Sequence, residues 1–174
     1  AIVEGEMGAD VDLALHYLRV VNRSTQLKGW YWNTEEAYTL TPNISDQIEL
    51  PSNTLKVDPS DTDILKQYVE RGGLLYDREN STYTITLPVK VNLVILLSFD
   101  ELPEAARNFI TVRAARLFQD RVQGDDAQHM YSQRDEMDAW IELRDSEAKY
   151  ADYNMASNDP LIYRTVGRHL RRRY

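Results

Sequence analysis

The sequence contains no cysteine, which excludes disulfide bonds and zinc sites that use thiolate ligands. It also lacks any apolar run near the ~20 residues that a membrane-spanning helix needs, and its longest, residues 91–99, is interrupted by Asn92. Residues 1–10 are acidic and do not have the cationic start of a secretory signal. With 43% hydrophobic and 28% charged residues among 174, the composition is typical of a soluble globular domain, and we expect no membrane association.

Sequence signatures of catalytic and cofactor sites are also missing. No serine lies in a GxSxG turn, and Gly72-Gly73 lacks the GKS or GKT continuation of a phosphate-binding loop. The histidines are widely separated and none belongs to an HExxH pair, so we interpret them as surface residues: His16, His129 and His169. We therefore expect no metal, nucleotide or organic cofactor, and a protein that is not an enzyme.

Charge is distributed unevenly along the chain. The formal net charge of −8 is opposite in sign to that of most proteins that grip DNA, whereas residues 167–174 (GRHLRRRY) have no acid. One interpretation of this basic end is a solvated terminus. The other is an arm that docks on an acidic surface, where guanidinium groups bind carboxylates through paired hydrogen bonds. The arginines concerned are Arg164, Arg168, Arg171, Arg172 and Arg173.

Helical periodicity is clear in the first part of the chain. Val11, Leu15 and Leu18 recur at the spacing of one helix face, which predicts a helix over residues 10–27. Gly29 is suited to the position just past the end of that helix.

The rest of the sequence predicts an α+β fold. Residues 30–99 are rich in aromatic and β-branched side chains with prolines between short runs, which predicts a β-rich region. Two more helices are predicted over residues 103–123 and 126–150, joined by a short connection. We expect an antiparallel helical bundle (10–27 and 103–150) with a β-rich insertion, and an extended basic C-terminal arm (151–174), all within a single domain, 1–174.

Within the β-rich region, three segments predict particular strands. Gly72-Gly73 lies between two short apolar runs and predicts a hairpin turn, although residues 64–70 also fit a short helix. Residues 83–87 alternate polar and apolar side chains, as a half-buried strand does. Residues 89–99 have the strongest strand character in the chain.

Two interpretations fit the aromatic stretch that opens this region. Trp30 and Trp32 share one face of an extended segment and would fill a core or an interface, because large aromatic side chains most often serve burial. Alternatively, they would stack on sugar rings beside Glu35 and Glu36, as in a carbohydrate-active hydrolase. Adjacent residues on a strand point to opposite faces, so these two carboxylates make a poor catalytic pair, and we favour burial.

Four segments resemble, in order and approximate spacing, the tail tubular protein A family of autographivirus-type short-tailed bacteriophages. Residues 28–36 (KGWYWNTEE) resemble that family's element after its first long helix, and residues 71–78 (RGGLLYDR) resemble its hairpin. Residues 99–107 (FDELPEAAR) resemble the acidic, proline-started helix entry of phage head–tail connectors. Residues 153–155 (YNM) resemble a motif after the last helix. The family usually has one more helix before the segment that begins here, and the residues after Pro160 depart from its pattern.

The resemblance implies a structural subunit of a tail adaptor ring. Such a ring has twelve copies between the portal protein and the tail nozzle protein (tail tubular protein B), with tail fibres near its lower rim and double-stranded DNA passing through it. A charge of −8 on each copy suits a lumen that repels phosphate. The implied location is the tail of the virion, after assembly in the host cytoplasm. The interface candidates are Trp30, Trp32, Arg71, Tyr76, Arg78, Tyr153, Arg164, Arg168, Arg171, Arg172 and Arg173.

Two other classes of function remain open from the sequence. One is a carbohydrate-active hydrolase of the tail, based on the tryptophans and the acids that follow them. The other is a nucleic-acid-binding module, which the arginine-rich end alone suggests.

Overall fold

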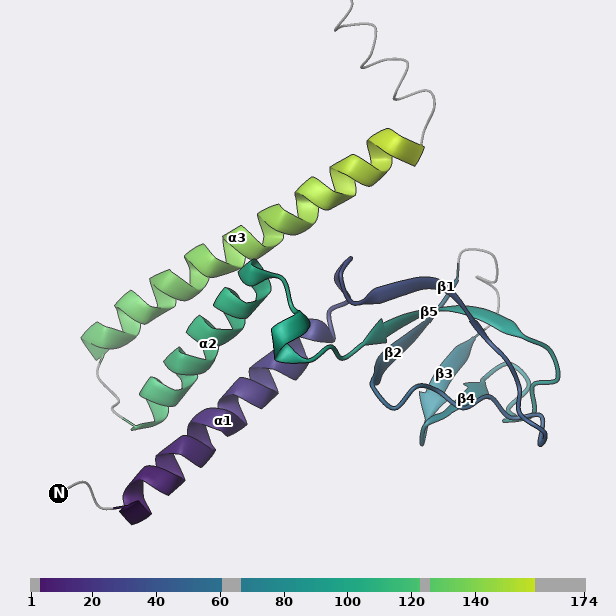
Figure 1. Ribbon diagram of the computed structural model, residues 1–174, viewed down its shortest axis with the longest axis horizontal. Coiled ribbons are helices and arrows are strands. Elements are labelled where there is room, and N and C mark those ends of the chain that lie inside the picture. The colour runs from purple at the N-terminus through teal and green to yellow at the C-terminus, as the bar shows by residue number, and fades with distance from the viewer. Residues whose placement is uncertain (1–3, 61–66, 123–125, 159–174) are drawn as a thin grey trace, which may run out of the picture. The chain divides into compact units, whose positions relative to one another are not determined.

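The computed structural model describes residues 4–60, 67–122 and 126–158 of the chain (Figure 1). The chain divides into two compact units, residues 1–103 and residues 104–174. In the described part, the first unit contains helix α1 and strands β1 to β5, and the second contains helices α2 and α3. This mixture of helices and antiparallel strands confirms the predicted α+β class.

Helix α1 spans Glu4–Gln26 and begins earlier than the predicted residue 10. Its end is as predicted, because Gly29 follows with a φ of 73°, which glycine adopts without strain, and its N–H donates to Gln26 O at 3.1 Å. Val21 is buried near this end, whereas Val11 and Leu15 are exposed by 54% and 41%. The packing of α1 in a bundle with the other helices stays a prediction.

Three antiparallel strands form the main sheet of the first unit: β1 (Thr34–Leu40), β5 (Val89–Ile95) and β2 (Thr54–Pro59), in that order. The central strand β5 buries Val89, Val91 and Leu93 on one face. Asn92, the polar residue within this apolar run, has a structural role. Its Oδ1 accepts a hydrogen bond at 2.9 Å from the N–H of Ala37, which has a φ of 51° where the register between β1 and β5 shifts.

Strands β3 (Tyr68–Arg71) and β4 (Leu74–Asp77) form the predicted hairpin. Gly72 and Gly73 have φ values of 62° and 79°, the left-handed conformation that two-residue hairpin turns need at both positions. The alternative of a short helix over residues 64–70 is therefore wrong for residues 68–70, and residues 61–66 lie outside the described chain.

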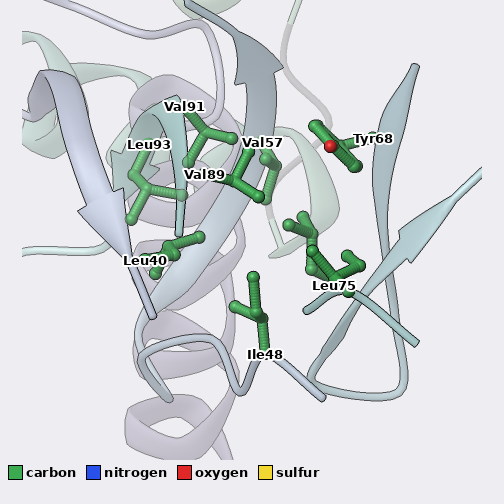
Figure 2. Close-up of a cluster of buried hydrophobic side chains, with 9 residues drawn as sticks. Leu40, Ile48, Val57, Tyr68, Leu75, Val89, Val91 and Leu93 are labelled. Atoms are coloured by element: carbon green, nitrogen blue, oxygen red, sulfur yellow. The ribbon is translucent and has the colours of Figure 1, made fainter. Parts of the chain in front are cut away.

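A hydrophobic cluster joins the main sheet to the hairpin (Figure 2). Side chains from β5 face those of the hairpin across the connecting segment that carries Ile48. The Leu75 N–H donates to Ile48 O at 2.9 Å, so the backbone of this segment is also tied to β4. The buried members of the cluster are Leu40, Ile48, Val57, Tyr68, Leu75, Ile85, Val89, Val91 and Leu93.

The strand predicted at residues 83–87 does not form. The backbone there has an isolated bridge between Thr82 and Asp77, and the Ile85 N–H donates to Asp46 O at 2.7 Å instead of to a strand ladder. Ile85 is buried but Leu87 is 72% exposed, so the apolar residues that alternate with polar ones in this segment do not share one buried face. Pro88 follows directly and has no N–H to extend a ladder.

The second unit is an antiparallel helix pair formed by α2 (Glu104–Val122) and α3 (Asp126–Asn158) (Figure 1). A short 3-10 helix, Phe99–Glu101, precedes it, and Pro103 lies just before the first residue of α2. Helix α3 continues past the predicted end at residue 150, so residues 151–158 of the predicted arm are helical. Residues 159–174, which carry the arm's arginines, lie outside the described chain.

Candidate protein-binding surfaces

A network of buried polar groups fixes the end of α1 to the main sheet. Asn33 is 1% exposed, and its Nδ2 donates to Gln26 O and to Ile95 O, each at 2.9 Å. Its Oδ1 accepts from the Trp30 N–H at 2.8 Å. The fully buried Gln26 side chain accepts from the Leu97 N–H at 2.8 Å and donates to Leu97 O at 3.0 Å. These bonds connect the helix terminus to the chain around the end of β5 and make the junction rigid.

The two candidate tryptophans stack on each other beside this network, with ring centroids 6.2 Å apart and an interplanar angle of 6°. Trp30 is 5% exposed, and its Nε1 donates to Thr25 O at 2.8 Å. Trp32 is half-buried, whereas Glu35 and Glu36 are exposed on β1. Trp30 therefore presents almost no surface on which a sugar ring could stack, and the geometry does not favour the hydrolase.

The hairpin places two other candidates in direct contact. The guanidinium carbon of Arg71 lies 3.9 Å from the centroid of the Tyr76 ring, a cation–π arrangement. Tyr76 also meets Tyr83 edge-on, with ring centroids 4.8 Å apart. Arg71 and Tyr83 are exposed and Tyr76 is half-buried, so this cluster faces solvent. Arg78 is exposed just after β4, with its N–H bonded to Gln67 O at 2.9 Å.

In the second unit, α2 and α3 are joined by an aromatic contact and by ion pairs. Phe109 and Trp140 have ring centroids 5.1 Å apart. Glu136 accepts hydrogen bonds from Arg113, at 2.9 Å, and from Arg116. The Glu136 and Arg116 side chains are only 14% and 17% exposed, so water screens this pair less than it would a surface pair.

Catalytic chemistry is not apparent in the described part of the chain. No group of three or more histidine, acidic or cysteine side chains lies close enough there to hold a metal ion. Hydrogen bonds from the side chain and backbone of Ser98, the residue before the 3-10 helix, lower the pKa of Glu101, the last residue of that helix. This contact is fully exposed and is explained by capping of the helix.

The structure thus brings some of the candidates together and leaves others apart. Trp30 and Trp32 form one pair and Arg71 and Tyr76 another, while Tyr153 lies within α3. Sequence reasoning did not single out Asn33 and Tyr83, which complete these two sites. Asn33 lies within the family-like segment 28–36, but its contacts, like those of Tyr83, depend on how distant segments meet.

A family model described as tail tubular protein matches residues 2–153. Among curated proteins, the chain is similar to tail tubular protein A of Klebsiella phage KP34, with 29% identity over 125 residues. That alignment covers 71% of this chain and 66% of the relative, so the chain spans just under two thirds of the relative's length.

Proposed function

The chain belongs to the tail tubular protein family and is a structural protein of a bacteriophage tail, and we propose that it is a subunit of the adaptor ring between the portal and the tail nozzle. The family match over residues 2–153 carries this proposal. It covers the described β-containing unit and nearly all of the helix pair, so the likeness concerns the whole architecture and not a single motif.

The proposed ring has twelve copies and encloses a conduit for DNA ejection. A closed ring needs each subunit to present two different, complementary surfaces, so extended interfaces matter more than a pocket. Exposed aromatic and arginine side chains, which are enriched at protein interfaces, support this arrangement; examples are Arg71 on the hairpin and Tyr83 in the loop after it. The net charge of −8 on each copy supports a lumen through which DNA passes without binding.

The proposed partners are the portal protein, the nozzle protein and the tail fibres, and the proposed location is the virion tail after assembly in the host cytoplasm. None of the helices in the described ranges is long and apolar enough to cross a membrane. The arginines of residues 164–173 support a contact with the portal or with an adjacent subunit. They would bind an acidic surface there through paired hydrogen bonds to carboxylates.

The proposal is tested by mixing the purified full-length chain with portal rings from the same phage and imaging the products. We expect coaxial stacks of two rings, and a chain truncated after Asp159 should bind the portal more weakly, with a smaller dependence of affinity on salt. Equal portal affinity of the truncated and full-length chains at low and high salt would exclude a role for the arm. Failure of the full-length chain to bind the portal under any of these conditions would overturn the adaptor function.

A further inference from the structure

The β3–β4 hairpin has one face in the core and one face outside it. Tyr68 and Leu75 belong to the buried cluster, and side chains alternate along a strand. The register therefore places the alternate residues on the other side, which we call the outer face: Val69, Arg71, Leu74 and Tyr76, with Tyr83 packed against the last of these. This face is partly apolar and carries a cation.

The Arg71 side chain is pre-oriented on the outer face by the Tyr76 ring. Stacking on the Tyr76 ring at 3.9 Å restricts the guanidinium group but leaves its N–H edge available for hydrogen bonds. Tyr83 supports the Tyr76 ring from the edge. Neither Arg71 nor Arg78 has a carboxylate partner among the residues that the structure describes.

Acidic side chains of the hairpin itself are bound elsewhere. Glu70 Oε1 accepts from the Gly73 N–H at 3.0 Å and so closes the hairpin turn. Asp77 Oδ1 accepts from the N–H groups of Glu79 and Asn80, at 2.9 Å and 3.1 Å. These carboxylates keep their charge, but these bonds go to backbone donors, and neither forms an ion pair with Arg71 or Arg78 among the described residues.

A complementary surface is present on α3. Four exposed acids recur there at spacings of three and four residues and so share one face of the helix, which we call the acidic stripe: Asp135, Asp138, Glu142 and Asp145. The stripe is roughly 15 Å long at the α-helical rise. Within the described chain, none of these four has an ion pair, whereas Glu136, on the side facing α2, has two. Glu142 is the stripe residue that contacts α2, through a hydrogen bond from Asn108 Nδ2 at 3.5 Å.

We propose that the outer face of the hairpin in one subunit docks on the acidic stripe of α3 in a second copy of this chain. Arg71 and Arg78 would bind the carboxylates, and Tyr76 and Tyr83 would pack against the helix. Every copy carries both surfaces, so in a heterologous arrangement the contact repeats from one subunit to the next, as closure of a ring requires. It also offsets the repulsion between subunits that each carry a net charge of −8. The inference rests on the proposed ring and identifies the interface between neighbouring subunits within it.

Charge reversal with rescue tests this contact in the full-length chain. The hairpin variant combines Arg71→Glu with Arg78→Glu, the stripe variant combines Asp138→Arg with Asp145→Arg, and a third protein has all four changes. Lys90→Glu, an exposed change on β5, alters the net charge by −2 at a site outside both surfaces, against −4 in the hairpin variant and +4 in the stripe variant, and is the control for added negative charge. Assembly is followed by analytical ultracentrifugation over a dilution series in ~0.15 M salt, where exposed charges further apart than ~8 Å are screened.

We expect each two-residue variant to need at least a tenfold higher protein concentration for half-assembly, which corresponds to 1.4 kcal/mol or more. The four-residue variant should return to within about threefold of the parent, and Lys90→Glu should behave as the parent does. The contact is refuted if either two-residue variant assembles normally, or if the four-residue variant is no better than the two-residue ones. A parent chain that is monomeric would instead overturn the ring itself.

Discussion

Replacement of Asn33 by alanine tests whether the buried polar junction holds the first unit together. The substitution removes three hydrogen bonds, to Gln26 O, Ile95 O and the Trp30 N–H, from a side chain that is 1% exposed. At a net ~1 kcal/mol for each bond, the free energy of unfolding should fall by about 3 kcal/mol. Ile95 O and the Trp30 N–H would also lose this partner in a place where water cannot readily replace it, whereas Gln26 O keeps the Gly29 N–H.

Asn43 provides a matched control because it also makes three hydrogen bonds through its side chain, but it is exposed. Its Oδ1 accepts from the Ser45 and Gln47 N–H groups, at 2.9 Å and 3.1 Å, and its Nδ2 donates to Glu49 at 3.0 Å. Water can replace these partners, so Asn43→Ala should cost at most ~1 kcal/mol.

Urea unfolding measures both changes at one protein concentration, since assembly would otherwise shift the apparent stability. A Trp140→Phe background leaves Trp30 and Trp32 as the fluorescent reporters, and both lie at the junction. An Asn33→Ala cost equal to or below that of Asn43→Ala would refute the reasoning, because burial would then not determine the strength of these bonds.

Three further substitutions test local features. Gly73→Ala should destabilise the hairpin by about 1–2 kcal/mol in thermal or urea unfolding, because its φ of 79° strains a residue with a Cβ although nothing lies within 4 Å of that atom. Ser98→Ala should raise the pKa of Glu101 toward its ordinary value in an NMR titration. The pKa of Glu101 is lower in the folded state than in the unfolded state, so its ionised form stabilises the fold above the unfolded pKa, and this contribution is lost as pH falls through the folded pKa. In the variant, the dependence of stability on pH in the acid range should therefore be smaller. Glu136→Gln should cost about 2 kcal/mol in urea unfolding of the helix pair, because it removes the carboxylate that both Arg113 and the largely buried Arg116 bond, although Arg116 keeps Asp120 at 2.9 Å; a change below ~0.5 kcal/mol would show that solvent screens these pairs.

Local patterns predicted the elements whose signals are contained in a few neighbouring residues. Gly72-Gly73 identified the hairpin because two consecutive left-handed residues are needed there. The start of α1 was missed because residues 4–9 have little apolar periodicity and include Gly5 and Gly8, which have low helix propensity. At residues 83–87, alternation without a pairing partner gave a false strand.

Contacts between distant segments explain the rest of what the sequence left undetermined. The residues around Asn33 indicate only a turn. Its burial depends on the fold that brings Ile95, far along the chain, within hydrogen-bond distance. Tyr83 joins the Arg71–Tyr76 cluster only because the loop after β4 folds back on the hairpin. The resemblance of residues 71–78 to a phage tail family identified Arg71 and Tyr76 as candidates, but their cation–π contact required the structure.

The native mass of the purified chain tests the central claim most directly. A closed ring of twelve copies of 20.2 kDa should give a single species of roughly 240 kDa by native mass spectrometry, with a central opening in end-on electron micrographs. A chain that stays at 20.2 kDa, or forms only dimers, at micromolar concentration would contradict the adaptor ring.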